Sequence, residues 1–136
     1  MRDQSRALIV SDRMSHVKSL VAILGSLPTN VYVASTLKQA KEVLSREAFT
    51  LVFCDERLGG ESYRELLHSM ETNDNRLRLV VMLQTGEWEE YLEAVALGAF
   101  EAIRCPIEPS DVVKTLIQAT QGQAQPKQSQ AFQMTA

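Results

Sequence analysis

Two acidic residues each come directly after, or one residue beyond, a short apolar run. "ALIVSD" brings Asp12 close behind one run, and "LVFCD" ends another run on Asp55. A single acid at a strand end usually caps or solvates a turn. Two carboxylates held close together repel each other, and a hard cation such as Mg2+ relieves that repulsion by binding carboxylate, water and phosphate oxygens. If the two runs are neighbouring strands, the pair favours a site for a metal ion and a phosphate group over turn chemistry alone.

The elements that position these acids follow from the hydrophobic pattern. Short apolar runs alternate with segments in which apolar residues recur at helical spacing. Strands are expected at 7–10, 31–34, 50–54, 79–83 and 100–103, and helices at 14–27, 36–44, 63–70, 88–99 and 109–119. Five strand–helix units in alternation predict an α/β fold, a parallel doubly wound (βα)5 sheet with helices on both faces.

In such a sheet the functional crevice lies beyond the carboxyl ends of the strands. The informative side chains are therefore those that come just after each strand. These are Ser11, Asp12, Asp55, Glu56, Gln84, Arg104 and Cys105. The first and third strands are neighbours where the strand order reverses, so Asp12 and Asp55 are expected at the same edge.

Four segments in this order carry a family resemblance. "ALIVSDR", "LVFCDERLGG", "LGAFEAIRCP" and "EPSDV" together resemble the receiver domain of two-component response regulators, over about residues 6–120. The resemblance implies a flavodoxin-like three-layer sandwich with parallel strand order 2-1-3-4-5. We expect a receiver domain at 1–121. A Gln-rich flexible C-terminal tail is expected at 122–136, because that segment is poor in apolar residues.

The resemblance also assigns roles to individual residues. Asp55 matches the phospho-accepting aspartate, and Asp12 matches a direct Mg2+ ligand. The backbone carbonyl of Arg57 matches the third protein ligand, so the metal set is Asp12, Asp55 and Arg57. The Cys105–Pro106 peptide bond matches one that is cis in the family.

Three active-site positions depart from the family pattern. Ser11 stands where the family has the first acid of the pair, so Mg2+ binding should be weak. Cys105 replaces the lysine before the proline. An ungapped register puts Leu83 at the family's Thr/Ser position, while a two-residue gap would put Thr85 there. The ungapped register is preferred because it leaves the loop and helix lengths unchanged.

These departures leave two functions open. Phosphoryl transfer depends on neutralising charge on the phosphoryl oxygens, which a lysine does and a neutral thiol does not. One function is that of a single-domain receiver in a phosphorelay, which accepts a phosphoryl group on Asp55 and signals by protein–protein contact. The alternative is a pseudo-receiver that binds partners independently of phosphorylation.

Several partner and activity classes can be weighed from the sequence. The resemblance implies a sensor histidine kinase or phosphotransfer protein as partner, and a homodimer through the fourth helix, fifth strand and fifth helix. A net charge of -3 without a basic run excludes nucleic acid as an expected partner. Apolar runs are too short for a membrane span, so we expect a cytoplasmic protein. An enzyme is not expected, because a dehalogenase-type phosphatase needs a second aspartate where Arg57 stands.

The remaining reactive side chains give weaker expectations. Cys54 and Cys105 are expected as free thiols, because a disulfide cannot span two strands that flank a third. His16 and His68 lie in helical patterns without metal-ligand spacing, and we expect both to be solvated. Trp88, with Tyr91 beside it, forms either a partner surface or a cover over the end of the fourth strand.

Overall fold

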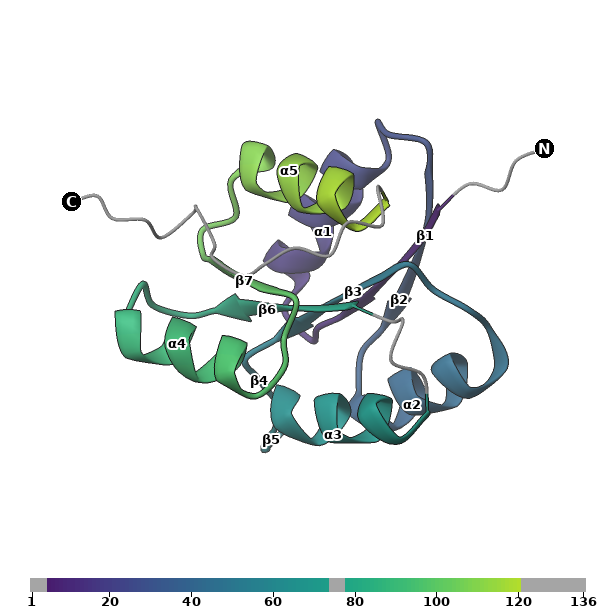
Figure 1. Ribbon diagram of the computed structural model, residues 1–136. Coiled ribbons are helices and arrows are strands. Elements are labelled where there is room, and N and C mark those ends of the chain that lie inside the picture. Colours follow the sequence, from purple (N-terminus) through teal and green to yellow (C-terminus); the bar gives the residue numbers. More distant parts are fainter. Residues whose placement is uncertain (1–4, 74–77, 121–136) are drawn as a thin grey trace.

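The computed structural model describes residues 5–73 and 78–120. A five-stranded sheet lies between two layers of helices, with α1 and α5 on one face and α2, α3 and α4 on the other (Figure 1). The main strands are β1 (Ser5–Val10), β2 (Thr29–Ala34), β3 (Leu51–Asp55), β6 (Arg78–Leu83) and β7 (Glu101–Arg104). The helices are α1 (Met14–Leu24), α2 (Leu37–Arg46), α3 (Tyr63–Asn73), α4 (Trp88–Ala96) and α5 (Pro109–Thr120).

The sheet has the predicted topology. Its strands are all parallel and lie in the order β2-β1-β3-β6-β7, which is 2-1-3-4-5 when the main strands are counted along the chain. In the register, Val10 pairs with Cys54 and Asp55 pairs with Met82. The carboxyl ends of β1, β3 and β6 therefore meet at one edge of the sheet, as the crevice expectation requires.

A short hairpin follows β3 and was not predicted. The strands β4 (Arg57–Leu58) and β5 (Glu61–Ser62) pair antiparallel, and two glycines connect them. Gly59 and Gly60 have φ values of 57° and 85°. Two-residue hairpin loops need positive φ at their central positions, which glycine adopts without steric cost. The glycine pair is the turn of this hairpin.

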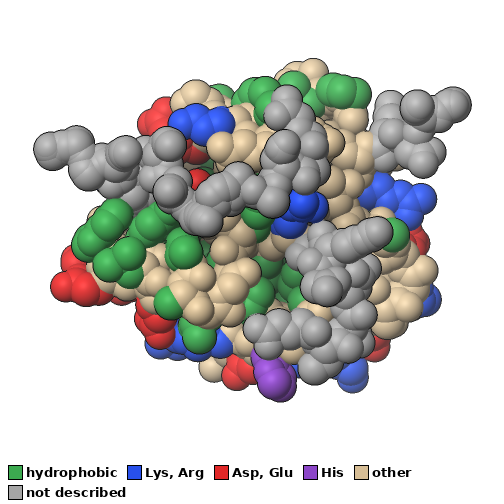
Figure 2. Space-filling view, in the orientation of Figure 1, with side chains coloured by type: hydrophobic (Ala, Val, Ile, Leu, Met, Phe, Trp, Pro, Cys, Tyr) green, Lys and Arg blue, Asp and Glu red, His purple; other side chains and the backbone are tan. Residues whose placement is uncertain are grey.

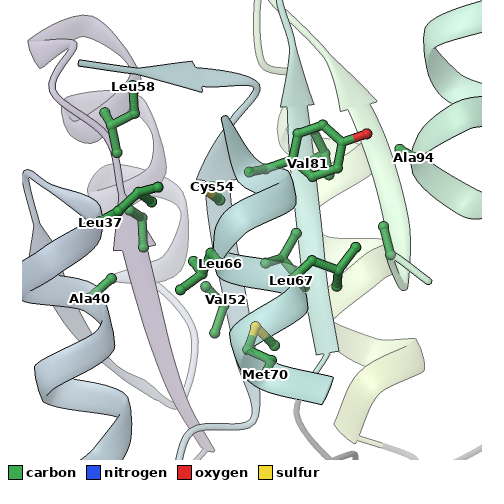
Figure 3. Packing of buried hydrophobic residues seen from close by; sticks show 14 of the residues in the cluster. Leu37, Ala40, Val52, Cys54, Leu58, Leu66, Leu67, Met70, Val81 and Ala94 are labelled. Carbon is green, nitrogen blue, oxygen red and sulfur yellow. The ribbon is translucent and has the colours of Figure 1, made fainter. Parts of the chain in front are cut away.

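The core has two halves, one on each face of the sheet. Alternate residues of β3 point to opposite faces, so Val52 and Cys54 pack with α2, α3 and α4, while Leu51 and Phe53 pack with α1 and α5. Figure 3 shows the first half, in which side chains of α3 lie against the sheet. Each fully buried aliphatic or aromatic side chain contributes about 1.5–3 kcal/mol. The continuous apolar strands are thus explained by burial on both faces.

Local signals fix where the helices begin. The side chain of Thr36 accepts a hydrogen bond from the backbone N–H of Gln39 and so caps the start of α2. Ser62 plays a similar part before α3, because its Oγ accepts from the N–H of Arg64 while Glu65 accepts from the N–H of Ser62.

The predicted tail at 122–136 lies outside the described residues. Among the helices of the described part of the chain, none is long and apolar enough to cross a membrane.

Candidate functional site

Asp55 is buried at the carboxyl end of the central strand β3. The residue is 2% exposed. Its Oδ2 accepts a hydrogen bond from the hydroxyl of Ser11, with 2.6 Å between the oxygens. Burying a carboxylate is costly unless hydrogen bonds replace the water that it loses. The residue that stands at the family's first acid position therefore acts here as a donor to the carboxylate.

The second partner of Asp55 is a histidine. Nδ1 of His16 lies 2.7 Å from Oδ1 of Asp55, and the His16 side chain is only 13% exposed. The expectation that His16 is a solvated helix residue is therefore wrong. It holds for His68, which is exposed on α3. His16 was missed because it lies in the first turn of α1, and sequence spacing alone does not show that this turn reaches the end of β3.

Ser11 links the carboxylate to the start of α1. Ser11 is 1% exposed, and its Oγ accepts a hydrogen bond of 3.0 Å from the backbone N–H of Arg13. A serine hydroxyl has one proton and accepts through its lone pairs, so Ser11 can serve Asp55 and Arg13 together. The N-terminal end of a helix carries partial positive charge, which stabilises a nearby anion. The charge of Asp55 is thus held by two side chains and by its position next to α1.

The other two members of the predicted metal set lie at the surface. Asp12 and Arg57 are both exposed. Within residues 5–73 and 78–120, no three His, Cys, Asp or Glu side chains are grouped so as to hold a metal ion. The predicted set is of a different kind, since it has two carboxylates and one backbone carbonyl. These are the oxygen donors that Mg2+ prefers, so the chemistry of the set fits this ion.

Glu56 connects the end of β3 with the loop before α4. Its backbone N–H donates to the carbonyl oxygen of Met82 at 3.1 Å. Its Oε1 accepts from the backbone N–H of Gln84, also at 3.1 Å. The two contacts hold the end of β6 and the residue after it against the residue that follows Asp55. Glu56 was expected at the crevice, but its contact with Gln84 was not predicted.

The two candidates for the family's hydroxyl position face different surroundings. Leu83 is the last residue of β6, and its side chain is buried in the core half formed with α2, α3 and α4. Thr85 is exposed, and its hydroxyl donates to a carboxylate oxygen of Glu90 at 2.9 Å. The Thr85 hydroxyl therefore donates to a residue of α4.

Cys105 lies where β7 ends. Its backbone N–H donates to the carbonyl oxygen of Leu83, and the Cys105–Pro106 peptide bond is cis, as expected. Partial burial, together with the negative charge of Asp55, raises the pKa of the Cys105 thiol to about 11. Both cysteines are free, which confirms that prediction. Burial, with a smaller effect of the Asp55 charge, also raises the pKa of the Cys54 thiol. Cys105 is therefore neutral at physiological pH.

The surface next to the site is formed by α4. Trp88 is 47% exposed and stacks on the ring of Tyr91, which is buried. The hydroxyl of Tyr91 donates to the buried Glu101 on β7, and Arg64 of α3 pairs with Glu93. Figure 2 shows hydrophobic side chains gathered over α4 beside acidic ones. Trp88 is thus an exposed surface residue, while Tyr91 belongs to the core.

Comparison with known proteins identifies the family. The family model of the response regulator receiver domain matches residues 7–117 of the chain. The chain belongs to the response regulator receiver family. The predicted fold, family and strand order are therefore confirmed together.

The curated relatives of this receiver are longer proteins. The chain is 27% identical to the transcriptional regulatory protein ZraR of Escherichia coli (strain K12), over 86% of this chain and 26% of that protein. It is also 27% identical to the response regulator protein PilR of Pseudomonas aeruginosa, over 77% of this chain and 24% of that protein. The chain spans about a quarter of the length of these relatives.

Solved receiver domains share the fold at low sequence identity. A putative response regulator from Chloroflexus aurantiacus J-10-fl superposes with a TM-score of 0.81 at 18% identity, covering 86% of this chain and 98% of that one. The beryllofluoride-activated NtrC4 receiver domain dimer gives a TM-score of 0.74 at 22% identity, covering 85% and 93%. These likenesses concern the fold, and the contacts of Asp55 described above belong to this chain.

Proposed function

We propose that this receiver accepts a phosphoryl group on Asp55 and passes the resulting signal on by protein–protein contact. The observation that carries the proposal is the position of the Asp55 carboxylate. It lies at the carboxyl end of the central strand, beside the start of α1, with Ser11 and His16 in contact with it. This edge of a doubly wound sheet is where ligands bind in such folds, which supports the proposed role of the carboxylate.

The proposed donor is a sensor histidine kinase or a phosphotransfer protein. We propose that Mg2+ assists through Asp12, Asp55 and the backbone carbonyl of Arg57, and that it binds weakly because Ser11 supplies no second charge at the first position. A bound Mg2+ would neutralise phosphoryl charge, which the neutral Cys105 cannot do. The partner surface proposed for the output, including a homodimer, is formed by α4, β7 and α5.

Phosphorylation can be tested directly with a small phosphoryl donor. The purified protein is incubated with acetyl phosphate and Mg2+, and its intact mass is followed with time. We expect one added phosphoryl group, which Asp55→Asn should abolish. Asp111→Asn, which changes an aspartate in the first turn of α5, is the matched control and should be labelled like the wild type. Labelling that survives Asp55→Asn would contradict the assignment of the acceptor.

A second function is favoured by a specific feature of the same site. Both carboxylate oxygens of Asp55 are already hydrogen-bonded, and the residue is almost fully buried. A receiver in this state would bind its partners through its fold, without a phosphate. In that case acetyl phosphate leaves the mass of the wild type unchanged, and Asp55→Asn still binds the same partners.

A further inference from the structure

The Asp55 carboxylate has one side-chain donor on each of its oxygens. Ser11 contacts Oδ2 at 2.6 Å and His16 contacts Oδ1 at 2.7 Å. Hydrogen bonds to a charged carboxylate are short and strong, and each one stabilises the negative charge where it lies. The two donors therefore lower the readiness of Asp55 to share an electron pair with another atom.

The two donors differ in how firmly they are held. Ser11 is 1% exposed, follows β1 directly, and is itself fixed by the N–H of Arg13. The His16 side chain is 13% exposed and extends from the first turn of α1. Turning the Ser11 hydroxyl away from Asp55 would also break its hydrogen bond with the Arg13 N–H, whereas the side-chain hydrogen bond described for His16 is the one to Asp55. His16 is thus the donor that can leave.

We propose that His16 is a positioning residue that keeps Asp55 closed, and that His16 must release Oδ1 before this oxygen accepts a phosphoryl group. The inference rests on the proposed function. In the step itself, a lone pair of the ionised carboxylate forms a bond to phosphorus, and the bond between phosphorus and the acetyl oxygen of acetyl phosphate breaks. Acetate leaves with that electron pair, and no proton is transferred to or from Asp55.

The release of Asp55 Oδ1 by His16 has a second consequence, which concerns α1. His16 joins the first turn of this helix to the end of β3, so release of Oδ1 removes a direct tie between the two elements. Ser11, through Arg13, still links Asp55 to the start of α1 by hydrogen bonds. Phosphorylation of Asp55 therefore acts first on the start of α1.

The test compares labelling rates of His16 variants with acetyl phosphate and Mg2+. His16→Ala and His16→Gln remove the donor at the Nδ1 position, and His16→Asn keeps an N–H close to that position. A hydrogen bond to a charged group is strong enough that its loss should speed labelling about tenfold or more in His16→Ala and His16→Gln. His16→Asn should stay slow, like the wild type. His68→Ala, on the exposed face of α3, is the matched control and should not change the rate.

A spectroscopic measurement checks the contact itself. In a nitrogen-detected correlation spectrum of the imidazole rings, Asp55→Asn should shift the Nδ1 signal of His16 and leave that of His68 in place. If His16→Ala shows no cooperative thermal transition and so is not folded, the rate comparison is made with a folded His16→Gln instead.

Each result separates the inference from the function on which it rests. If His16→Ala and His16→Gln are labelled at the same rate as the wild type, or more slowly, the inference is overturned and Asp55 remains the acceptor. If His16→Ala and His16→Gln are labelled and the wild type is not, the inference is supported, and the wild type in its resting state then binds its partners without a phosphate. If neither the wild type nor any His16 variant is labelled, both the role of His16 and the proposed phosphorylation of Asp55 are overturned.

Discussion

Nδ1 of His16 and Oδ1 of Asp55 lie 2.7 Å apart although 39 positions separate them in the sequence. The contact joins the first turn of α1 to the end of β3, and it makes a histidine part of the site around Asp55. Ser11 completes the arrangement from the other side of the carboxylate. The chemistry of Asp55 in this receiver is therefore set by two hydrogen-bond donors.

The first prediction concerns the stability of this arrangement. Asp55→Ala should lower the free energy of unfolding by about 1–3 kcal/mol, because the donors of Ser11 and His16 are then left in a buried site without their acceptor. Urea unfolding at neutral pH measures the change. Ser11→Ala should cost less in the Asp55→Ala background than in the wild type, since the contact is already gone. Ser45→Ala, which removes an exposed hydroxyl from α2, is the control, and strictly additive effects would contradict the coupling.

The second prediction concerns Mg2+. Ser11→Asp restores a second acid beside Asp55 and should tighten Mg2+ binding, because two adjacent carboxylates attract the ion more strongly than one. Without the metal the same change should destabilise the fold, since it replaces a donor to Asp55 by a like charge. Calorimetric titration and the melting temperature, each with and without Mg2+, measure the two effects. Ser15→Asp, in the exposed part of the first turn of α1, is the control for added charge. Equal affinities in the two variants would refute the assigned position of the metal.

The third prediction concerns the loop before α4. Glu56→Ala removes the acceptor of the Gln84 N–H, so the loop should loosen and the emission of Trp88, four residues further on, should change. Glu56→Gln keeps an acceptor oxygen and should retain an emission spectrum close to that of the wild type. Glu61→Ala, in strand β5 of the hairpin, is the control for loss of a surface charge. Trp88 is the only tryptophan, so the emission can be assigned without further labelling. Identical spectra for all four proteins would show that Glu56 does not hold this loop.

The fourth prediction concerns the thiols and pH. The pKa of Cys105 is raised from 9.0 to about 11, so the folded protein keeps this proton when the unfolded chain has already lost it. The stability that this provides is complete below about pH 9 and is lost as pH rises from 9 towards 11. Alkylation by iodoacetamide needs the thiolate and should be slow at pH 8, rising steadily up to about pH 11. Cys105→Ser removes the reactive site, and the buried Cys54 should react only in denaturant. Fast alkylation of Cys105 at pH 8 would contradict the raised pKa.

The fold was predictable because its causes are local in the sequence. Apolar runs such as "LVFC" are buried on both faces of a parallel sheet, and helical spacing separates each run from the next. The hairpin after β3 was missed, although the pair Gly59–Gly60 between short strands is a recognised turn signal. A two-residue strand has too few residues for an alternating pattern to show.

The site was predictable only in part, because its contacts join distant segments. Asp55 and Asp12 stand at strand ends, and the strand order brings those ends together. Whether each side chain turns inward depends on packing, and the structure buries Asp55 while Asp12 stays exposed. His16 could have been found by counting one helical turn beyond Asp12, since that turn begins at the same edge of the sheet.

The attachments of α4 have a mechanical consequence. Glu56 holds the residues before this helix, Arg64 of α3 pairs with Glu93 on it, and Glu101 of β7 accepts from Tyr91. Two of these contacts are on the helix itself and the third is on the segment before it, so a shift of α4 relative to β7 and α3 would have to break at least one of them. While these contacts hold, outward side chains of α4 such as Trp88 keep their places relative to β7 and α3.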